Sequence, residues 1–314
     1  AVECRGVVKC FRQGEVEIRA LRGVNLRIVT GGVTLIVGPS GCGKTTLLSV
    51  ISGILQPTEG DVCLFRQSIT KLPDSEKAHR RRREVGLVFQ QFNLLPGFTA
   101  AENVAIPLIL QGFPRRPAVR RAFQLLEQMQ VAEFGGTPPS DLSSGQQQRV
   151  AIARGLITEP RLLICDEPTS ALDVSVQSQI LNLLIDLRDE LGLTYVLISH
   201  NLAVVEHIAS RVAVMYLGRI VEEKETGALF GNPEHPYTQA LLASVLTPEP
   251  GKGVPDTHLG AQFPNPLDPP SGCMFHPRCS HAMAHCSRDK PPAVPSGDGH
   301  VECFLYSERD SHAA

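Results

Sequence analysis

The fold of this chain is decided by the run Gly38-Pro39-Ser40-Gly41-Cys42-Gly43-Lys44-Thr45, which separates two stretches of different character. Before it, Val33–Val37 is a short β-branched run, typical of a strand. After it, Lys44 to Ile54 has apolar residues at helical spacing. The sequence therefore predicts a strand, a glycine-rich loop and a helix, in that order.

The glycine-rich loop fits the pattern G-x-x-x-x-G-K-[ST] and stands where that pattern acts, between a strand and a helix. Glycines allow backbone N–H groups to wrap phosphates, and the N-terminus of the next helix adds the positive end of its dipole. Lys44 is expected to reach the β- and γ-phosphates of a nucleotide, and Thr45 to ligate Mg²⁺. The other expected nucleotide contacts are Gly38, Ser40, Gly41, Gly43 and Thr46. The alternative is a glycine turn with a purely structural role.

Strands and helices alternate again later in the chain. Residues 161–165 and Thr194–Ile198 are predicted strands, and Val174–Leu191 between them is a predicted helix. Buried strands that alternate with helices predict a parallel sheet covered on both faces. Between the two strand and helix units, residues 99–131 are expected to be mostly helical. Their candidate core positions are Leu108, Leu110, Leu125, Leu126 and Met129.

An acidic pair, Asp166-Glu167, follows the first of these later strands. Ligands of open α/β sheets bind at the carboxyl edge of the strands, so the pair should lie beside the glycine-rich loop. Asp166 could then hold Mg²⁺ through water, and Glu167 could act as general base toward the attacking water. The alternative is that the pair caps the following helix.

The run Leu142-Ser143-Ser144-Gly145-Gln146-Gln147-Gln148-Arg149 resembles the signature of the ATP-binding-cassette (ABC) family. Residues 166–173 follow it at the distance that this family has. The resemblance implies the ATP-hydrolysing subunit of an ABC transporter, acting as one half of a nucleotide-sandwich dimer. Ser143 and Gly145 would open a helix whose hydroxyl and free N–H groups meet the γ-phosphate bound by the other subunit. Ser144 stands where the family usually has a second glycine.

The resemblance implies roles for further residues. Gln90, with Gln91 as the alternative alignment, resembles the glutamine that senses Mg²⁺ and γ-phosphate and links to the membrane subunit. His200 resembles the histidine that contacts γ-phosphate and orients the attacking water, and Phe11 the aromatic residue that stacks on adenine. Two more nucleotide contacts are implied, Gln146 and Asp173.

The implied fold class is α/β: a P-loop NTPase cassette with an inserted helical subdomain, a small antiparallel β subdomain and a cysteine-containing C-terminal extension. The nucleotide-binding domain is predicted over residues 1–246, with the helical subdomain at about 92–158. The extension, 247–314, begins where prolines become frequent.

The resemblance also points to two subfamilies. Residues up to about 135 resemble ATPases of lipoprotein-release and macrolide-export systems. From about Pro139 onward the chain resembles oligopeptide and dipeptide importers, above all at residues 233–242 and 273–279. The chain is therefore interpreted as a recombinant of the two, with its join near the signature.

Composition narrows the expected partners and location. A formal net charge of −2 and the lack of tryptophan argue against nucleic acid as a partner, and the basic run Arg80 to Arg83 is interpreted as a solvated helix face. No run of 18 apolar residues and no secretion signal is seen, so the protein is expected at the cytoplasmic face of the cell inner membrane. The resemblance implies transmembrane permease subunits, a second ATPase subunit and, indirectly, a peptide-binding protein as partners.

Four cysteines near the C-terminus follow the spacing C-x5-C-x6-C-x16-C: Cys273, Cys279, Cys286 and Cys303. Four thiolates can hold zinc or an iron–sulfur cluster. The resemblance to peptide importers favours a [4Fe–4S] cluster, zinc is the alternative, and four unliganded cysteines remain a further possibility. Surface histidines that could join a zinc site are His276, His281 and His285.

The function that the resemblance favours is energising the import of oligopeptides or dipeptides. Export of lipoproteins or drugs is the alternative. A soluble ABC ATPase of DNA repair or translation is less favoured, because the chain shows neither a long coiled-coil insertion nor a second cassette.

Overall fold

The structure is a computed structural model that describes residues 1–14, 16–199, 208–244 and 264–307. His200 and the predicted boundary between 246 and 247 lie outside the described residues. The strands are β1 (Val2–Gln13), β2 (Val16–Ile28), β3 (Val33–Val37), β4 (Glu59–Leu64), β5 (Gln67–Ser68), β6 (Val85–Val88), β7 (Leu162–Asp166), β8 (Thr194–Ile198), β9 (Arg211–Tyr216), β10 (Arg219–Glu225), β11 (Ala293–Ser296) and β12 (Gly299–Glu302). The helices are α1 (Lys44–Ile51), α2 (Asp74–Glu84), α3 (Ala100–Leu110), α4 (Arg115–Gln128), α5 (Ser144–Leu156), α6 (Val174–Leu191), α8 (Thr226–Gly231) and α9 (Pro236–Ala243).

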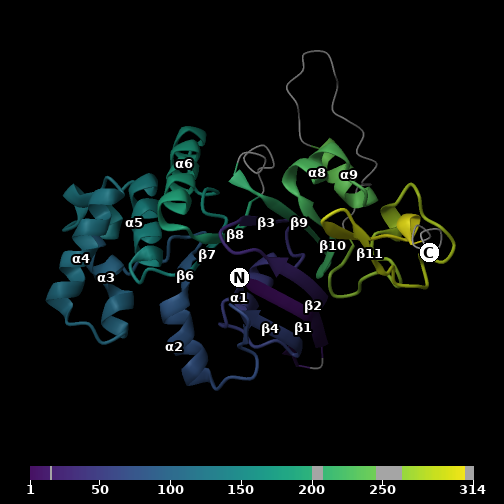
Figure 1. Ribbon diagram of the computed structural model, residues 1–314, viewed down its shortest axis with the longest axis horizontal. Coiled ribbons are helices and arrows are strands. Elements are labelled where there is room, and N and C mark those ends of the chain that lie inside the picture. Colours follow the sequence, from purple (N-terminus) through teal and green to yellow (C-terminus); the bar gives the residue numbers. More distant parts are fainter. Residues whose placement is uncertain (15, 200–207, 245–263, 308–314) are drawn as a thin grey trace, which may run out of the picture.

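The strands of the described residues form two sheets (Figure 1). A four-stranded antiparallel sheet has the order β2-β1-β4-β5, and an eight-stranded sheet has the order β11-β12-β10-β9-β3-β8-β7-β6. In the larger sheet β9, β3, β8, β7 and β6 are parallel, and β10, β12 and β11 continue it antiparallel. The predicted fold class is confirmed.

The parallel strands are buried on both faces because their sequences are continuously apolar. Every residue of β3 is buried, and alternation along the strand sends Leu35 and Ile36 to opposite faces. Leu35 packs in the same cluster as residues of α5 and α6, whereas Ile36 packs with residues of α1 and the smaller sheet. The larger sheet is therefore covered on both faces, as predicted.

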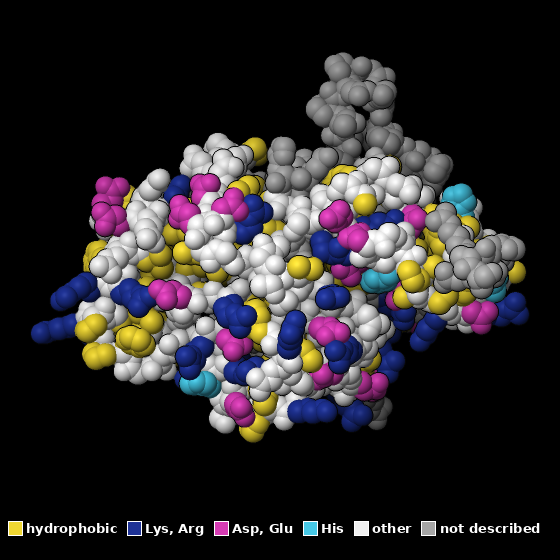
Figure 2. Space-filling model, viewed as in Figure 1, with side chains coloured by type: hydrophobic (Ala, Val, Ile, Leu, Met, Phe, Trp, Pro, Cys, Tyr) yellow, Lys and Arg dark blue, Asp and Glu magenta, His cyan; other side chains and the backbone are white. Residues whose placement is uncertain are grey.

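Three helices, α3, α4 and α5, lie side by side at one end of the molecule (Figure 1), and Figure 2 shows exposed hydrophobic side chains on this end. They fall within the predicted helical subdomain, whose bounds stay a prediction. The prediction that Leu110 belongs to the core is wrong, because its side chain is 62% exposed. Leu110 lies two residues after the buried Leu108, which places it about 200° further around α3 and off the apolar stripe. None of the helices that the structure describes is long and apolar enough to cross a membrane.

The C-terminal segment joins the larger sheet instead of forming a separate body. Its strands β11 and β12 form a hairpin, and β12 pairs with β10, where Val301 is opposite Glu222. Phe275 is 3% exposed and packs against Tyr216 of β9 and Tyr237 of α9, with ring centroids 5.5 and 5.6 Å away. Strand pairing with β10 and aromatic packing on β9 and α9 thus hold the segment to the rest of the molecule.

Candidate active site

The glycine-rich loop runs from the end of β3 to the start of α1, where the sequence predicts it. Gly43 precedes α1 with a φ of 103°, and a Cβ there would lie 2.6 Å from the carbonyl oxygen of Ala20. Gly38 is equally confined by the carbonyl of Met215. Only glycine fits these two places, because the loop backbone is packed closely against Ala20 and Met215 behind it.

Lys44 is buried, and its Nζ donates hydrogen bonds to the carbonyl oxygens of Gly38 at 2.9 Å and Pro39 at 3.0 Å. The ammonium group is therefore held inside the loop. Phosphate oxygens carry negative charge and are stronger partners for an ammonium than neutral carbonyls, so a bound nucleotide could take these bonds over. Most of the other predicted contact residues of the loop can be reached from solvent. Ser40, Gly41 and Thr45 are exposed, and Thr46 is half-buried.

Gln90 and Glu167 come together although 77 residues separate them. Strands β6 and β7 pair in parallel, with Val88 opposite Cys165, so the residues after both strands leave the same edge of the sheet. The Nε2 of Gln90 donates to Oε2 of Glu167 at 3.2 Å. Glu167 has a φ of 49°, which turns it out of line with β7 just after Asp166. The predicted base and the predicted sensing glutamine thus share one place.

The start of α5 is built as a capping box. Ser143 is the N-cap: its Oγ accepts from the N–H of Gln146, and its own N–H donates to Oε1 of Gln146 at 2.8 Å. Gly145 faces α6, where a Cβ would lie 3.0 Å from Cγ1 of Val176. Within the part of the chain that the structure describes, no hydrogen bond joins this helix start to the glycine-rich loop.

Arg154 connects α5 to the segment that follows Gln90, and this contact was not predicted from the sequence. It lies on α5, and its guanidinium donates to the carbonyls of Phe92 and Asn93, both at 2.6 Å. Both acceptor residues have positive φ, 55° and 49°. Burial lowers the pKa of Arg154 from its ordinary value. Because its partners are backbone atoms two and three residues after Gln90, no side-chain motif in the sequence could have indicated the contact.

Two predicted nucleotide contacts lie at exposed positions. Phe11, on β1, is 39% exposed, and the Nζ of Lys9 lies 5.2 Å from its ring centroid. Asp173 is the N-cap of α6 and makes no side-chain cap hydrogen bond. The structure gives neither residue a contact with the glycine-rich loop in its described part, so both roles stay predictions.

The four predicted cysteine ligands line one cavity of about 20 Å³, together with His276 and His281. Burial and neighbouring thiols raise the pKa of Cys303 to about 11, and burial also raises the pKa of Cys273 and Cys279. His285 instead packs its ring on Phe304. Within the described residues, no three His, Cys, Asp or Glu side chains are placed to share a metal ion.

Two family models match the chain. The model described as "ABC transporter" matches residues 21–170, and the model described as "Oligopeptide/dipeptide transporter, C-terminal region" matches residues 221–286. The first match contains the glycine-rich loop, the start of α5 and the acidic pair. The second contains most of β10, all of α9 and three of the four cysteines.

Two solved structures of a similar fold are described as dimeric. The dimeric structure of a post-hydrolysis state of the ATP-binding cassette MJ0796, bound to ADP and Pi, superposes with a TM-score of 0.67 at 38% identity. It covers 72% of this chain and 99% of that one. The dimeric structure of the same cassette described as a bacterial ABC transporter cassette agrees equally well.

Curated relatives match over nearly the whole chain. The "Probable peptide ABC transporter ATP-binding protein y4tS" of Sinorhizobium fredii is 44% identical over 94% of this chain and 85% of its own length. The dipeptide transport ATP-binding proteins DppF of Haemophilus influenzae and Escherichia coli are 41% and 39% identical, over 92% and 94% of this chain and 89% of each relative. With its glycine-rich loop, acidic pair and α5 cap in place, the chain belongs to the ABC transporter family of ATPases, among the ATP-binding proteins that carry the oligopeptide/dipeptide transporter C-terminal region.

Proposed function

We propose that this chain hydrolyses ATP to energise the import of oligopeptides or dipeptides through a membrane. The observation that carries the proposal is a combination found in one chain. The Gln90–Glu167 pair and the glycine-rich loop leave the same edge of the parallel sheet, and a C-terminal segment of the peptide-transporter type pairs with that sheet. The first feature supports ATP hydrolysis, and the second supports peptides as the cargo.

The glycine-rich loop fits a nucleoside triphosphate with Mg²⁺. A Cβ at Gly38 or Gly43 would clash with the backbone behind the loop, so these glycines keep the loop in its place, and Lys44 donates to two carbonyl oxygens within it. Thr45 and Asp166 would hold Mg²⁺, which neutralises phosphate charge when bound. Lys44 would bind the β- and γ-phosphates, while the cradle fixes their position, so catalysis rests on orientation and charge stabilisation.

Glu167 would take the proton of the attacking water. Gln90 is close enough to hold the carboxylate of Glu167 in position, because it already donates a hydrogen bond to it. The neutral amide of Gln90 can donate without removing the charge that a base needs. His200, which lies outside the described residues, is proposed to contact the γ-phosphate on the strength of the family resemblance alone.

The site would be completed by a second ATPase subunit. Ser143 is exposed at the start of α5, and among the described residues no hydrogen bond joins it to the loop. Free N–H groups at this helix start can donate hydrogen bonds to the γ-phosphate held by another subunit, and the positive end of the helix dipole attracts that phosphate. The dimeric state of the solved relatives supports this arrangement. Permease subunits would attach the dimer to the cytoplasmic face of the membrane.

Uptake by a reconstituted transporter tests the proposal. The chain, co-purified with permease subunits encoded beside its gene and placed in proteoliposomes, should hydrolyse ATP faster when the matching binding protein and a di- or oligopeptide are added, and should accumulate that peptide. Stimulation by a lipoprotein or macrolide, with none by peptides, would establish the export alternative instead.

We further propose that Cys273, Cys279, Cys286 and Cys303 hold a metal centre: the [4Fe–4S] cluster implied by the resemblance, or zinc. The four thiols line one cavity, which supports a shared ligand. About 20 Å³ accommodates roughly one water molecule, so the segment would have to open around a cluster and much less around a single ion. The centre's role would be structural, through the packing of Phe275.

Metal analysis distinguishes these alternatives. Protein purified without oxygen should contain iron and sulfide in the ratio of a cluster, and stoichiometric zinc would establish the zinc site. Replacing Cys279 with serine should then expose the C-terminal segment to proteases while ATP hydrolysis persists. Protein that contains neither iron nor zinc would contradict the proposal.

A further inference from the structure

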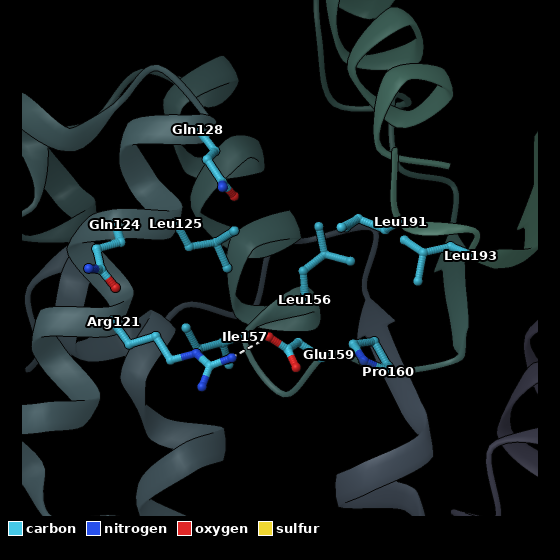
Figure 3. A pocket seen from close by; sticks show the side chains of 10 residues that line it. All are labelled: Arg121, Gln124, Leu125, Gln128, Leu156, Ile157, Glu159, Pro160, Leu191 and Leu193. Atoms are coloured by element: carbon cyan, nitrogen blue, oxygen red, sulfur yellow. Dashed lines mark hydrogen bonds and ion pairs between the residues drawn. The ribbon is translucent and has the colours of Figure 1, made fainter. Parts of the chain in front are cut away.

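A cavity of about 430 Å³ lies between α4, the turn after α5 and the turn between α6 and β8 (Figure 3). It opens at the N-terminal ends of β7 and β8, whereas the nucleotide residues follow the C-terminal ends of β3 and β7. None of the predicted nucleotide or cysteine ligands among the described residues lines it. Its volume falls in the range of about 300–1,000 Å³ that small-molecule sites have.

The walls of the cavity are apolar and preformed. Leu156 and Ile157 at the end of α5 and Leu193 before β8 are almost fully buried, so their positions are fixed by the core. Leu191, at the end of α6, is 56% exposed and leaves an apolar surface facing the opening. Leu125 closes the cavity from α4 (Figure 3). A ligand that enters must therefore be largely apolar.

Opposite charges face each other at the rim. Arg121 of α4 forms an ion pair with Glu159, and Figure 3 shows this pair crossing the lower side of the cavity. Both side chains are well exposed, 44% and 79%, so the pair is weak and exchangeable. Glu159 has a φ of 53°, a conformation that L-residues rarely adopt, and this turn places its carboxylate at the rim.

Two amides complete the rim. Gln124 and Gln128 are four residues apart on α4, so they lie on one face of the helix above the apolar wall (Figure 3). Each offers both donors and an acceptor, as a peptide group requires. A fatty acid could use Arg121 but would meet the carboxylate of Glu159. A molecule with both an ammonium and a carboxylate satisfies both charged side chains at once.

We propose that this cavity binds a short zwitterionic peptide with apolar side chains, and that this binding slows ATP turnover. The carboxylate pairs with Arg121, the ammonium with Glu159, the peptide group with the two glutamines, and the side chains fill the leucine-lined interior. The role as feedback by an imported product rests on the proposed function. Binding itself does not.

The position of the cavity explains how binding would act. A bound peptide joins α4 to the turns before β7 and β8, and it covers the C-terminal end of α5. The same helix presents Ser143 at its other end, and Arg154 on it holds the segment after Gln90. Tying α4 to the end of α5 would oppose any shift of α5 during turnover, and so act on both groups that the proposed hydrolysis uses.

Calorimetry with leucyl-leucine on the purified, nucleotide-free chain tests the binding. Leucyl-leucine should bind, whereas N-acetyl-leucyl-leucinamide, which lacks both charges, and octanoate should bind at least tenfold more weakly. Arg121→Gln and Glu159→Gln should each weaken leucyl-leucine binding at least tenfold. Arg120→Gln, one residue earlier on α4 and outside the cavity lining, should leave binding unchanged. Leu191→Ser, at an exposed position that tolerates replacement, should weaken it independently of charge.

The regulatory part is tested on the same proteins. Saturating leucyl-leucine should lower ATP turnover of the parent severalfold, and should not affect Arg121→Gln, whose basal turnover stays at the parent level. Absence of leucyl-leucine binding at millimolar concentration, or equal binding of octanoate, overturns the site. Binding without any effect on turnover overturns the feedback role. Since these measurements need no membrane subunits, a failed uptake experiment would leave the binding result standing.

Discussion

Gln90 donates a hydrogen bond to the carboxylate of Glu167 at the end of β7. Replacing that carboxylate with an amide of the same size tests whether Glu167 acts as the base. Glu167→Gln should still bind Mg-ATP, because the loop and Lys44 are untouched. Its turnover should fall about 10²–10⁴-fold, the usual contribution of a general base. Nucleotide binding and single-turnover hydrolysis measure the two effects separately.

Lys44→Ala is the matched control, since it removes the phosphate partner and should weaken nucleotide binding itself. Hydrolysis by Glu167→Gln near the parent rate would mean that another group takes the proton.

Arg154 should matter for turnover more than for nucleotide affinity. Arg154→Gln removes two hydrogen bonds from a charged donor to the segment after Gln90, each of a kind that contributes about 1.5–3 kcal/mol. We expect a clear loss of kcat with little change in KM for ATP, because the glycine-rich loop is not involved. Steady-state kinetics measure this.

Arg149→Gln controls for a general loss of stability. Arg149 lies on the same helix and donates to the carbonyl of Met129 at 2.9 Å, away from Gln90. It should lower the free energy of unfolding without the selective fall in kcat. Equal kinetic effects of the two changes would contradict the positioning role of Arg154.

The stability of the protein should depend on the protonation of His235 at the start of α9. His235 is buried, its Nδ1 accepts from the N–H of Tyr237 at 3.0 Å, and desolvation lowers its pKa to about 3. The unfolded chain binds the proton from about pH 6.5 downward, whereas the folded chain resists it, so this stability is present above pH 6.5 and is lost as the pH falls. Between pH 6.5 and 4 the loss should be roughly 3 kcal/mol.

His235→Asn keeps an oxygen that can cap the helix but does not titrate in this range. Urea unfolding of both proteins from pH 7 to pH 4 separates the effect of His235 from that of other buried carboxyl groups, Glu223 and Glu302, whose pKa values are raised by burial. Parallel curves for the two proteins would show that His235 does not resist protonation.

The glycine-rich loop and the start of α5 could be predicted because each is specified by residues that are adjacent in the sequence. A β-branched run, glycines and a lysine specify β3, the turn and α1, and Ser143 with Gln146 specifies a capped helix start. The Arg154 contact could not be predicted, since it depends on backbone atoms of a distant segment. Nor could the place of β12 beside β10, because strand pairing depends on partners far along the chain. Leu110 shows the limit of periodicity: an apolar residue off the stripe was placed in the core.

The assembled molecule should show its shared site in how activity depends on concentration. Because Ser143 and Gly145 are proposed to act on a nucleotide held by another subunit, ATP hydrolysis by the dilute chain should rise more steeply than linearly with protein concentration. Chromatography of Glu167→Gln with ATP should show a dimer that disappears without nucleotide. A fully active monomer would exclude the shared site.

The pairing of β12 with β10 has a consequence for biosynthesis. The glycine-rich loop is synthesised early, yet the edge of the sheet at β10 stays unpaired until residues 299–302 have been made. An unpaired strand attracts strands of other chains. A nonsense mutation ahead of β12 should therefore favour aggregation of the truncated chain, which light scattering of the truncated and the full-length protein would measure.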